Sequence, residues 1–353
     1  MLPPEGVLMI RFGPSGIPLS CKGRTPRDGI EDVHTLGLNA MEIQFVRVNV
    51  IERYASDEED GMLPSEVRGE LVVDMLRENK KGDLVPTSKK GAKIKEGDTL
   101  RSLVCGIGND YFELKDTGKL ARELDVELSL HTPYYMDLSG MDEISDRSMA
   151  NVIYGGLIAD ALGVHVVVTH MGLYGGMDPD DATKAVVKKM NALLKQFADR
   201  GIKARIGLET SGKQMVYGSL DEVLEVIAKA RGTVPVLNFP HIHARGHGSL
   251  QSKEDFQEVF DRARKAARLN WYYTHFSGVQ HEGGNEKRYT PIKKGDLKFD
   301  PLAECLLDND FAVTVISGSP LLEHDAMYMK VIMERIMLKR EGKLHKTLKE
   351  ASR

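Results

Sequence analysis

Short apolar runs alternate along the chain with longer segments in which apolar residues recur at helical spacing. Because the runs are rich in β-branched residues and apolar on both faces, they are typical of buried parallel strands. Eight runs have this character, at residues 7–13, 40–46, 126–131, 164–170, 204–209, 234–238, 271–276 and 311–317. Strands and helices in this alternation predict a (β/α)8 TIM barrel. A doubly wound open sheet is the alternative, which the lack of a GxGxxG motif after the first run makes less favourable.

Start and stop signals of single residues support the predicted helices. Thr25 and Pro26 suit the N-cap and the first position of a helix after the first strand. Gly201 follows a long amphipathic segment and suits the left-handed residue that ends a helix. Ser219, with Glu222 three residues later, has the sequence pattern of a capping box. These signals place helices where the barrel pattern requires them.

One segment, residues 49–107, interrupts the alternation. Its first part, ASDEEDGM, is acidic, whereas ENKKGDLVPTSKKGAKIKEGDTLRSL is basic, rich in turn residues and typical of hairpins. A stretch of this length is too long for an ordinary connection. We therefore predict a single barrel domain over residues 1–353, with a small β-rich subdomain inserted after the second strand. An insertion at that end of a strand overhangs the mouth of the barrel, where active sites lie.

The composition is that of a globular protein, with 41% hydrophobic residues, 28% charged residues and a net charge of −4. No apolar run approaches the roughly 20 residues that a membrane span needs, and the N-terminal segment lacks the pattern of a signal peptide. The three cysteines are far apart and are typical of reduced thiols, so we expect a cytoplasmic protein without membrane contact. The charge neither supports nor excludes nucleic-acid binding, which needs only a basic face.

Residues of metal-binding type stand at the ends of five consecutive predicted strands, the third to the seventh. They are His131, His170, Glu209, Asn238 with His241 three residues later, and His275. Because strand ends converge at the mouth of a barrel, we expect these side chains to lie close together. Imidazoles grouped around a carboxylate make a poor core but a good site for zinc, manganese or iron. We predict the histidines and Glu209 as metal ligands, and Glu209 also as the catalytic carboxylate.

Each of these residues also has a simpler explanation when it is taken alone. A histidine that ends a strand is usually a hydrogen-bonded structural residue, and Glu209 alone is explained as a buried, paired carboxylate. His243 is a secondary candidate, because it lies two residues after His241 and can turn inward with it. The basic segment 283–296 is interpreted either as a solvated loop or as a phosphate-binding loop. Its candidate phosphate ligands are Arg288, Lys293 and Lys294.

The strand-end motifs, taken in order, resemble those of the endonuclease IV family. "LHTPYYMDLS" resembles its "HAPY" stretch, "THMGLYGG" its "HPG" segment and "IGLETSGKQ" its "ENTAGQG". "VLNFPHIHARG" is similar to its Asp–x–x–His stretch, and "THFSG" to its "HLND". The resemblance covers about residues 126–320 and places the chain among the xylose isomerase-like TIM barrels. Any one of these motifs is weak evidence, whereas five in the same order are considerably more specific.

The resemblance implies a DNA-repair enzyme that cleaves the backbone at abasic sites with three zinc ions. His131, His170 and Glu209 match the ligands of the first ion, with Glu209 bridging to a second. Four positions depart from the family pattern, where carboxylates or a histidine are expected, and these are Asn238, Gly318, Lys287 and Tyr289. Because lost carboxylates remove charge that offsets the metal, one or two zinc ions are expected rather than three, and Asn238 and Tyr289 become secondary ligand candidates.

Three hypotheses follow for the function. The first is a zinc-dependent phosphodiester hydrolase resembling endonuclease IV, with abasic-site DNA as its partner. The second is a sugar or sugar phosphate isomerase or epimerase of the same superfamily, which normally needs two opposed carboxylates, whereas the sequence indicates only Glu209. The third is a non-catalytic barrel whose metal site has decayed. They are ranked in this order, and the gap between the first and the third is small.

Overall fold

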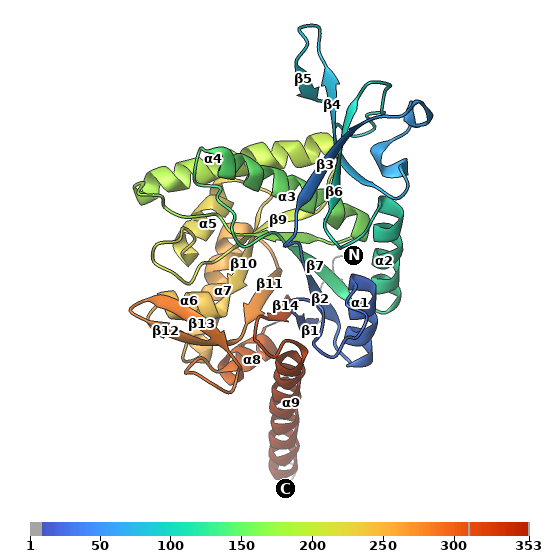
Figure 1. Ribbon diagram of the computed structural model, residues 1–353. Coiled ribbons are helices and arrows are strands. Elements are labelled where there is room, and N and C mark those ends of the chain that lie inside the picture. Colours follow the sequence, from blue (N-terminus) through green and yellow to red (C-terminus); the bar gives the residue numbers. More distant parts are fainter. Residues whose placement is uncertain (1–8, 310, 352–353) are drawn as a thin grey trace.

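The computed structural model describes residues 9–309 and 311–351. Eight parallel strands form the wall of a barrel, and helices cover its outside (Figure 1). The strands are β1 (Ile10–Pro14), β2 (Ala40–Gln44), β7 (Glu127–His131), β8 (Val166–Thr169), β9 (Arg205–Glu209), β10 (Val234–Asn238), β11 (Trp271–Phe276) and β14 (Ala312–Ser317). The helices are α1 (Pro26–Thr35), α2 (Tyr111–Glu123), α3 (Glu143–Leu162), α4 (Pro179–Arg200), α5 (Leu220–Lys229), α6 (Phe239–Arg245), α7 (Lys253–Ala267), α8 (Phe299–Leu307) and α9 (Glu323–Ala351).

The barrel strands are hydrogen-bonded in the order β2, β7, β8, β9, β10, β11, β14 and β1. A parallel bridge between Ser15 and Glu42 links the ends of β1 and β2 and nearly closes the ring. The predicted (β/α)8 fold is confirmed, and each predicted barrel strand is present with small differences at its ends. Residues 7 and 8 of the first prediction lie outside the described residues. Because all the strands point the same way, their carboxyl ends meet at one mouth.

The residues predicted to begin and end helices do so. The hydroxyl of Thr25 accepts from the backbone N–H of Asp28 at 3.2 Å, and that of Ser219 accepts from the N–H of Glu222 at 3.3 Å. Gly201 ends α4 with a φ of 74°, a left-handed conformation that glycine adopts without steric cost. Between the helices and the strands the core is aromatic and aliphatic, with Phe260 packed edge-on against Tyr272.

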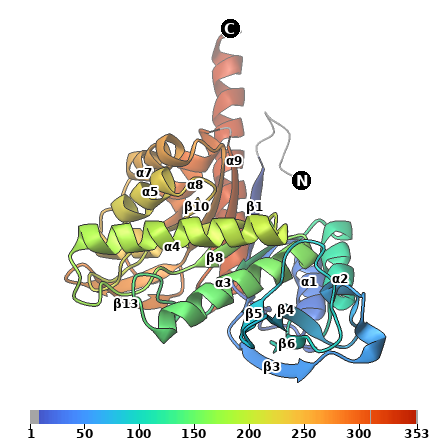
Figure 2. The ribbon, with the colours of Figure 1, turned by 90° about the horizontal axis from the view of Figure 1, so that it is seen from above.

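Between β2 and α2 the chain forms a separate antiparallel sheet in the strand order β3, β6, β4, β5. Its strands are β3 (Asn49–Tyr54), β4 (Leu71–Glu78), β5 (Leu84–Pro86) and β6 (Thr99–Val104), with the short 3-10 helices η1 (Asp57–Glu59) and η2 (Pro64–Glu66). A small apolar cluster of its own supports it, made of Val67, Val72, Met75, Ile94 and Leu100. Figure 2 shows this inserted sheet at the end of the barrel opposite to that from which α9 projects.

The segment after β11 forms a hairpin, β12 (Gly278–Glu282) and β13 (Asn285–Thr290). The interpretation of residues 283–296 as a loop is therefore wrong for 285–290. The two strands are short and polar and bury little of their surface, so they leave no apolar run to indicate them. The histidine-rich stretch after β10 is helix α6, and it packs against the hairpin. None of the described helices combines the length and apolar character needed to cross a membrane.

Candidate metal centre

A cavity of about 730 Å³ opens at the mouth of the barrel. Its rim is apolar and comes largely from the loops after β7, β8 and β9, with Tyr134, Tyr135, Met136, Ile144, Leu173 and Val216. Its floor is polar and consists of strand-end residues and two residues of the hairpin. These are Glu42, His131, His170, Glu209, Asn238, His241, His275, Glu286 and Tyr289. The predicted metal ligands thus lie around one cavity.

The ends of β7, β8 and β9 bring together His131, His170 and Glu209, which we call the ligand group. Oε2 of Glu209 lies 2.9 Å from Nε2 of His131 and 3.3 Å from Nδ1 of His170. One ligand atom from each residue lies within 4.8 Å of the other two. Glu209 is almost fully buried, whereas 21% of the His170 side chain is exposed. The group therefore lies at the bottom of the cavity with one side toward solvent.

The hydrogen bonds of His131 show which of its nitrogens is available to a ligand. Nδ1 lies 2.6 Å from the carbonyl oxygen of Thr132, so it carries a proton and donates it. Burial opposes a charged ring, but the hydrogen bond of Nε2 to Glu209 and the charges of Glu42 and Glu209 raise the pKa of His131, so a bound metal would replace the proton on Nε2. A carbonyl that fixes the tautomer in this way is the usual support of a metal-binding histidine. Two imidazole nitrogens and one carboxylate oxygen beside an open cavity fit a divalent ion such as zinc, manganese or iron.

A second buried carboxylate, Glu42 in the middle of β2, lies across His275 from the ligand group. Nε2 of His275 lies 2.8 Å from Oε2 of Glu42, and Nδ1 lies 3.2 Å from Oε1 of Glu209. Three further donors bond to the oxygens of Glu42, namely Ser15, Gln44 and Tyr273. His275 therefore bridges two carboxylates, and both of its nitrogens face an acceptor.

The charges of this bridge follow from burial and proximity. Burial opposes a charged imidazole, but the carboxylates of Glu42 and Glu209 overcome it and raise the pKa of His275 to about 10. Burial likewise opposes ionisation of Glu42, yet His275 and then His131 lower its pKa to about 2. Burial lowers the pKa of His170 to about 4, so this ring is neutral at pH 7. At neutral pH His275 is thus a buried cation between two anions.

Glu42 is a site residue that the sequence analysis missed. The signal was a lone carboxylate within the apolar run AMEIQFV, where a charged side chain is costly to bury without partners. A strand in a barrel buries both faces, so an acid inside such a run has to point to a polar interior. Glu286 was also missed, because it lies on the hairpin that was interpreted as a loop.

Three of the four departures from the family pattern, Asn238, Tyr289 and Gly318, form a second set of contacts with His241, and we call these four residues the tyrosine cluster. Nδ2 of Asn238 donates to Oε1 of Glu209 at 2.6 Å and to the hydroxyl oxygen of Tyr289 at 2.7 Å. The Tyr289 hydroxyl in turn lies 2.7 Å from Nε2 of His241. Each polar atom along this path therefore meets a complementary partner.

The second nitrogen of His241 fixes the direction of these hydrogen bonds. Nδ1 lies 2.6 Å from the carbonyl oxygen of Thr210, which only accepts, so Nδ1 carries the proton of the neutral ring. Nε2 then accepts from the hydroxyl of Tyr289. Oε2 of Glu286 also lies 3.3 Å from this nitrogen. His241 and His275 also line the cavity. Nε2 of His241 meets the Tyr289 hydroxyl, and the two nitrogens of His275 face two different carboxylates, whereas His131 and His170 each direct one nitrogen at the same oxygen of Glu209.

His243 belongs to a separate contact with Asp296 and His281, outside the main cavity. Nε2 of His243 lies 3.3 Å from one oxygen of Asp296, and Nε2 of His281 lies 3.1 Å from the other. Nδ1 of His243 accepts from the backbone N–H of Leu250, so its proton is on Nε2 and points toward Asp296. Three ligand-type atoms are close together here. The hydrogen bond in this group joins His281 to Asp296, and His243 of α6 faces the same carboxylate at 3.3 Å.

The predicted phosphate ligands lie on or after the hairpin and do not line the cavity. Nε of Arg288 donates to the side chain of Gln280 across the hairpin at 3.0 Å. Nζ of Lys293 lies 4.4 Å from the centre of the Tyr328 ring. Lys294 is exposed just after it. Among the described residues that line the cavity, Lys213 carries the one ammonium group.

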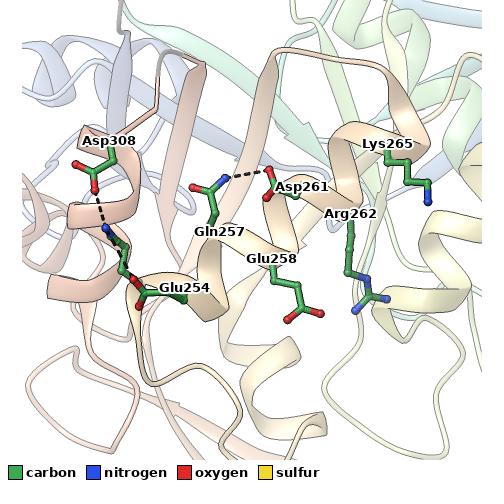
Figure 3. Close-up of a pocket in the computed structure, with 8 residues that line it drawn as sticks. Glu254, Gln257, Glu258, Asp261, Arg262, Lys265 and Asp308 are labelled. Carbon is green, nitrogen blue, oxygen red and sulfur yellow. Dashed lines mark hydrogen bonds and ion pairs between the residues drawn. The ribbon is translucent and has the colours of Figure 1, made fainter.

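A second cavity, of about 560 Å³, lies on the outer surface along α7 (Figure 3). Its lining is charged, and some of the charges pair with one another, as in the 2.9 Å contact between Lys253 and Asp308. The side chains of Gln257 and Asp261 bond one turn apart along α7, at 2.9 Å. This is a solvated helix face, and it holds none of the strand-end residues.

Comparison with known proteins agrees with this architecture. Residues 104–324 match the family model of the xylose isomerase-like TIM barrel. The chain belongs to this family. It is also 24% identical over 262 residues to the uncharacterized protein MJ0133 of Methanocaldococcus jannaschii, a match that covers 73% of this chain and 89% of that protein.

Similar solved structures come from more than one kind of family member. Endonuclease IV from Thermus thermophilus matches with a TM-score of 0.55 and 17% identity, over 93% of this chain and 99% of that one. SacUVDE matches with a TM-score of 0.56 and 13% identity, over 94% and 99%. An L-ribulose 3-epimerase matches with a TM-score of 0.54 and 10% identity, over 94% and 96%. At these identities the likeness shows the fold alone.

Proposed function

We propose that this protein is a metal-dependent phosphodiester hydrolase that acts on DNA at abasic sites and uses a single divalent ion held by the ligand group. The observation that supports it is the convergence of two imidazole nitrogens and a carboxylate oxygen at the bottom of an open cavity. Zinc suits this donor set best, and manganese or iron are alternatives. When bound, the ion supplies Lewis-acid polarisation of a phosphoryl oxygen.

The residues around the ligand group have supporting roles in this proposal. Asn238 and His275 hold the oxygen of Glu209 that faces away from His131, which fixes the orientation of the carboxylate. Glu42 supplies the counter-charge that keeps His275 protonated. Pre-oriented groups of this kind cost little reorganisation when charge develops on a reacting phosphate.

The rim of the cavity supports a nucleic acid rather than a small free substrate. Tyr134 is 76% exposed and Tyr135 is 54% exposed, directly after the strand that ends in His131. Exposed aromatic rings beside a site are platforms on which bases stack. We assign flanking phosphate contacts to Lys213 at the cavity and to Arg288, Lys293 and Lys294 near the hairpin.

The test is cleavage of a labelled DNA duplex that carries one abasic-site analogue. Metal-free protein would be loaded with one equivalent of zinc, manganese or iron and incubated at low salt, because phosphate contacts weaken as salt rises. We expect a cut at the lesion that requires metal, with no cut in the undamaged duplex. Metal-loaded protein that neither cleaves nor binds the lesion duplex rules out this function. A protein that takes up no metal points instead to the non-catalytic hypothesis.

A sugar isomerase or epimerase is the second candidate, and Glu42 is the observation that favours it. With Glu42 the cavity has two buried carboxylates on opposite sides of His275, as the second hypothesis requires. Both carboxyl groups have lowered pKa values and several hydrogen-bond donors, which makes them poor bases. This candidate predicts exchange of a substrate C–H proton with deuterated solvent, measured by NMR with a panel of ketoses, ketose phosphates and manganese.

A further inference from the structure

We propose that the phenol of Tyr289 takes the place of a second metal ion, so that the centre binds one ion only and Tyr289 acts as a positioning residue for Glu209. The inference rests on the proposed metal site. It assigns a joint role to Asn238, His241, Tyr289 and Gly318, the tyrosine cluster, which the sequence indicated only as separate losses.

The hydrogen bonds of the tyrosine cluster leave His241 without a free lone pair. A metal ligand has to offer a lone pair, and the one on Nε2 of His241 already accepts a hydrogen bond from the Tyr289 hydroxyl at 2.7 Å. The hydroxyl oxygen accepts from Asn238 at 2.7 Å, so the phenol is held as a neutral donor and acceptor. The donors and acceptors of the cluster therefore match one another without an ion. In the ligand group, by contrast, no hydroxyl or amide separates the histidines from Glu209.

The amide of Asn238 gives both Glu209 and Tyr289 a hydrogen-bond donor. Its Oδ1 accepts from the backbone N–H of His241 at 3.2 Å and caps α6, which orients Nδ2 toward Glu209 and Tyr289. An aspartate would keep the cap, but it would place a second carboxylate oxygen at the 2.6 Å contact with Glu209. Two carboxylates at that distance need either a shared proton or a metal cation between them. Asparagine therefore supplies by N–H donation what a second ion would otherwise supply.

The space for the phenol comes from Gly318 at the end of β14. A Cβ atom on this residue would lie 3.2 Å from Cε2 of the Tyr289 ring, which is tighter than an ordinary contact. A glutamate at this position and the ring of Tyr289 would therefore compete for the same volume. The glycine and the tyrosine form one packing unit, which explains why the departures from the family pattern lie together.

The experiment measures metal stoichiometry by elemental analysis after zinc loading and gel filtration, with no reference to activity. We expect one equivalent in the wild-type protein and in Tyr289→Phe. The double variant Asn238→Asp/Tyr289→His offers a carboxylate and an imidazole and frees Nε2 of His241, and we expect it to bind two equivalents. Glu282→His is the matched control, because it adds an exposed histidine to the same hairpin at a position without a ligand in the family pattern, and it should leave the count at one.

A second readout keeps the inference testable if the double variant does not fold. Ligation would convert Tyr289 to a phenolate, whose near-ultraviolet absorption differs from that of a phenol. We expect the difference spectrum on metal loading to be the same in wild type and Tyr289→Phe. Two equivalents in the wild type, a phenolate band that disappears in Tyr289→Phe, or a folded double variant that stays at one equivalent would each overturn the inference. No metal in any variant would instead contradict the proposed function.

Discussion

The two halves of the barrel mouth contain similar residues and differ in where their protons lie. In the ligand group, His131 and His170 direct nitrogens at one oxygen of Glu209. In the tyrosine cluster, an amide and a hydroxyl stand between the histidine and the same carboxylate. From this difference we infer that a high density of histidines is not enough for a metal site, and that the nitrogens also have to face one carboxylate with no amide or hydroxyl between them.

The largest effect is expected from substitutions in the ligand group, and it concerns zinc affinity. We expect Glu209→Gln and His131→Ala to weaken zinc binding by more than the roughly 10–100-fold typical of residues that only support a ligand. The measurement is competition with a chromogenic chelator. His247→Ala, which removes an exposed histidine of the same region, is the control and should leave affinity unchanged. Equal loss in the control and the variants would show that the ligand group is not the site.

The second-largest effect is expected from removing the buried cation His275, and it concerns the stability of the fold. His275→Asn leaves Glu42 and Glu209 without their counter-charge, and breaking a buried ion pair in this way costs about 3–5 kcal/mol. We expect a lower free energy of unfolding in urea. Adding Glu42→Gln removes one of the uncompensated charges and should recover part of the loss. If the double variant is less stable than His275→Asn, the charge argument for this bridge is wrong.

A smaller effect is expected from filling the space beside Tyr289. In Gly318→Ala the new methyl group crowds the ring, and overpacking of this kind typically costs about 1–3 kcal/mol. Thermal unfolding measures it. Gly342→Ala is the control, because nothing lies near that position and alanine favours its helix. A Gly318→Ala protein as stable as wild type would indicate that Tyr289 is not held in place by packing.

The smallest effect concerns the pH dependence of the tyrosine cluster. Burial opposes ionisation of Glu286, but His241 in its protonated form, which donates from Nε2, and then Lys213 lower the pKa of this carboxyl below its ordinary value of 4.5. A carboxyl with a lowered folded-state pKa adds stability above its unfolded pKa and loses it as pH falls through the folded value. We expect less than about 1 kcal/mol, since the group is partly exposed. The acid-induced loss of stability should be weaker in Glu286→Gln than in wild type, and identical pH profiles would refute this role.

Much of the fold could be predicted because it depends on local patterns. The barrel strands appear as apolar runs, and Thr25, Gly201 and Ser219 mark helix ends through contacts within a few residues. The hairpin β12–β13 could not be predicted in this way. Its strands are polar, and they are held by pairing with each other and by packing against α6. Their own residues therefore do not indicate that they form strands.

The candidate site also has one part that the sequence indicated and one part that it did not. The sequence placed His131, His170 and Glu209 at neighbouring strand ends, and parallel strands in a barrel bring such ends together whatever the loops do. It did not indicate Glu42, which is 233 residues from its partner His275. It also presented Asn238, Tyr289 and Gly318 as separate losses, because a sequence shows which ligands are missing but does not show what fills their place.

Periodicity in the sequence was therefore enough to predict the barrel, and strand direction was enough to expect His131, His170 and Glu209 at one mouth. Which histidine nitrogens already accept a hydrogen bond was decided by the tertiary structure, because the donors come from segments far away in the sequence. The Tyr289 hydroxyl reaches His241 from a hairpin 48 residues away. The direction of a single hydrogen bond there separates a metal ligand from a structural histidine.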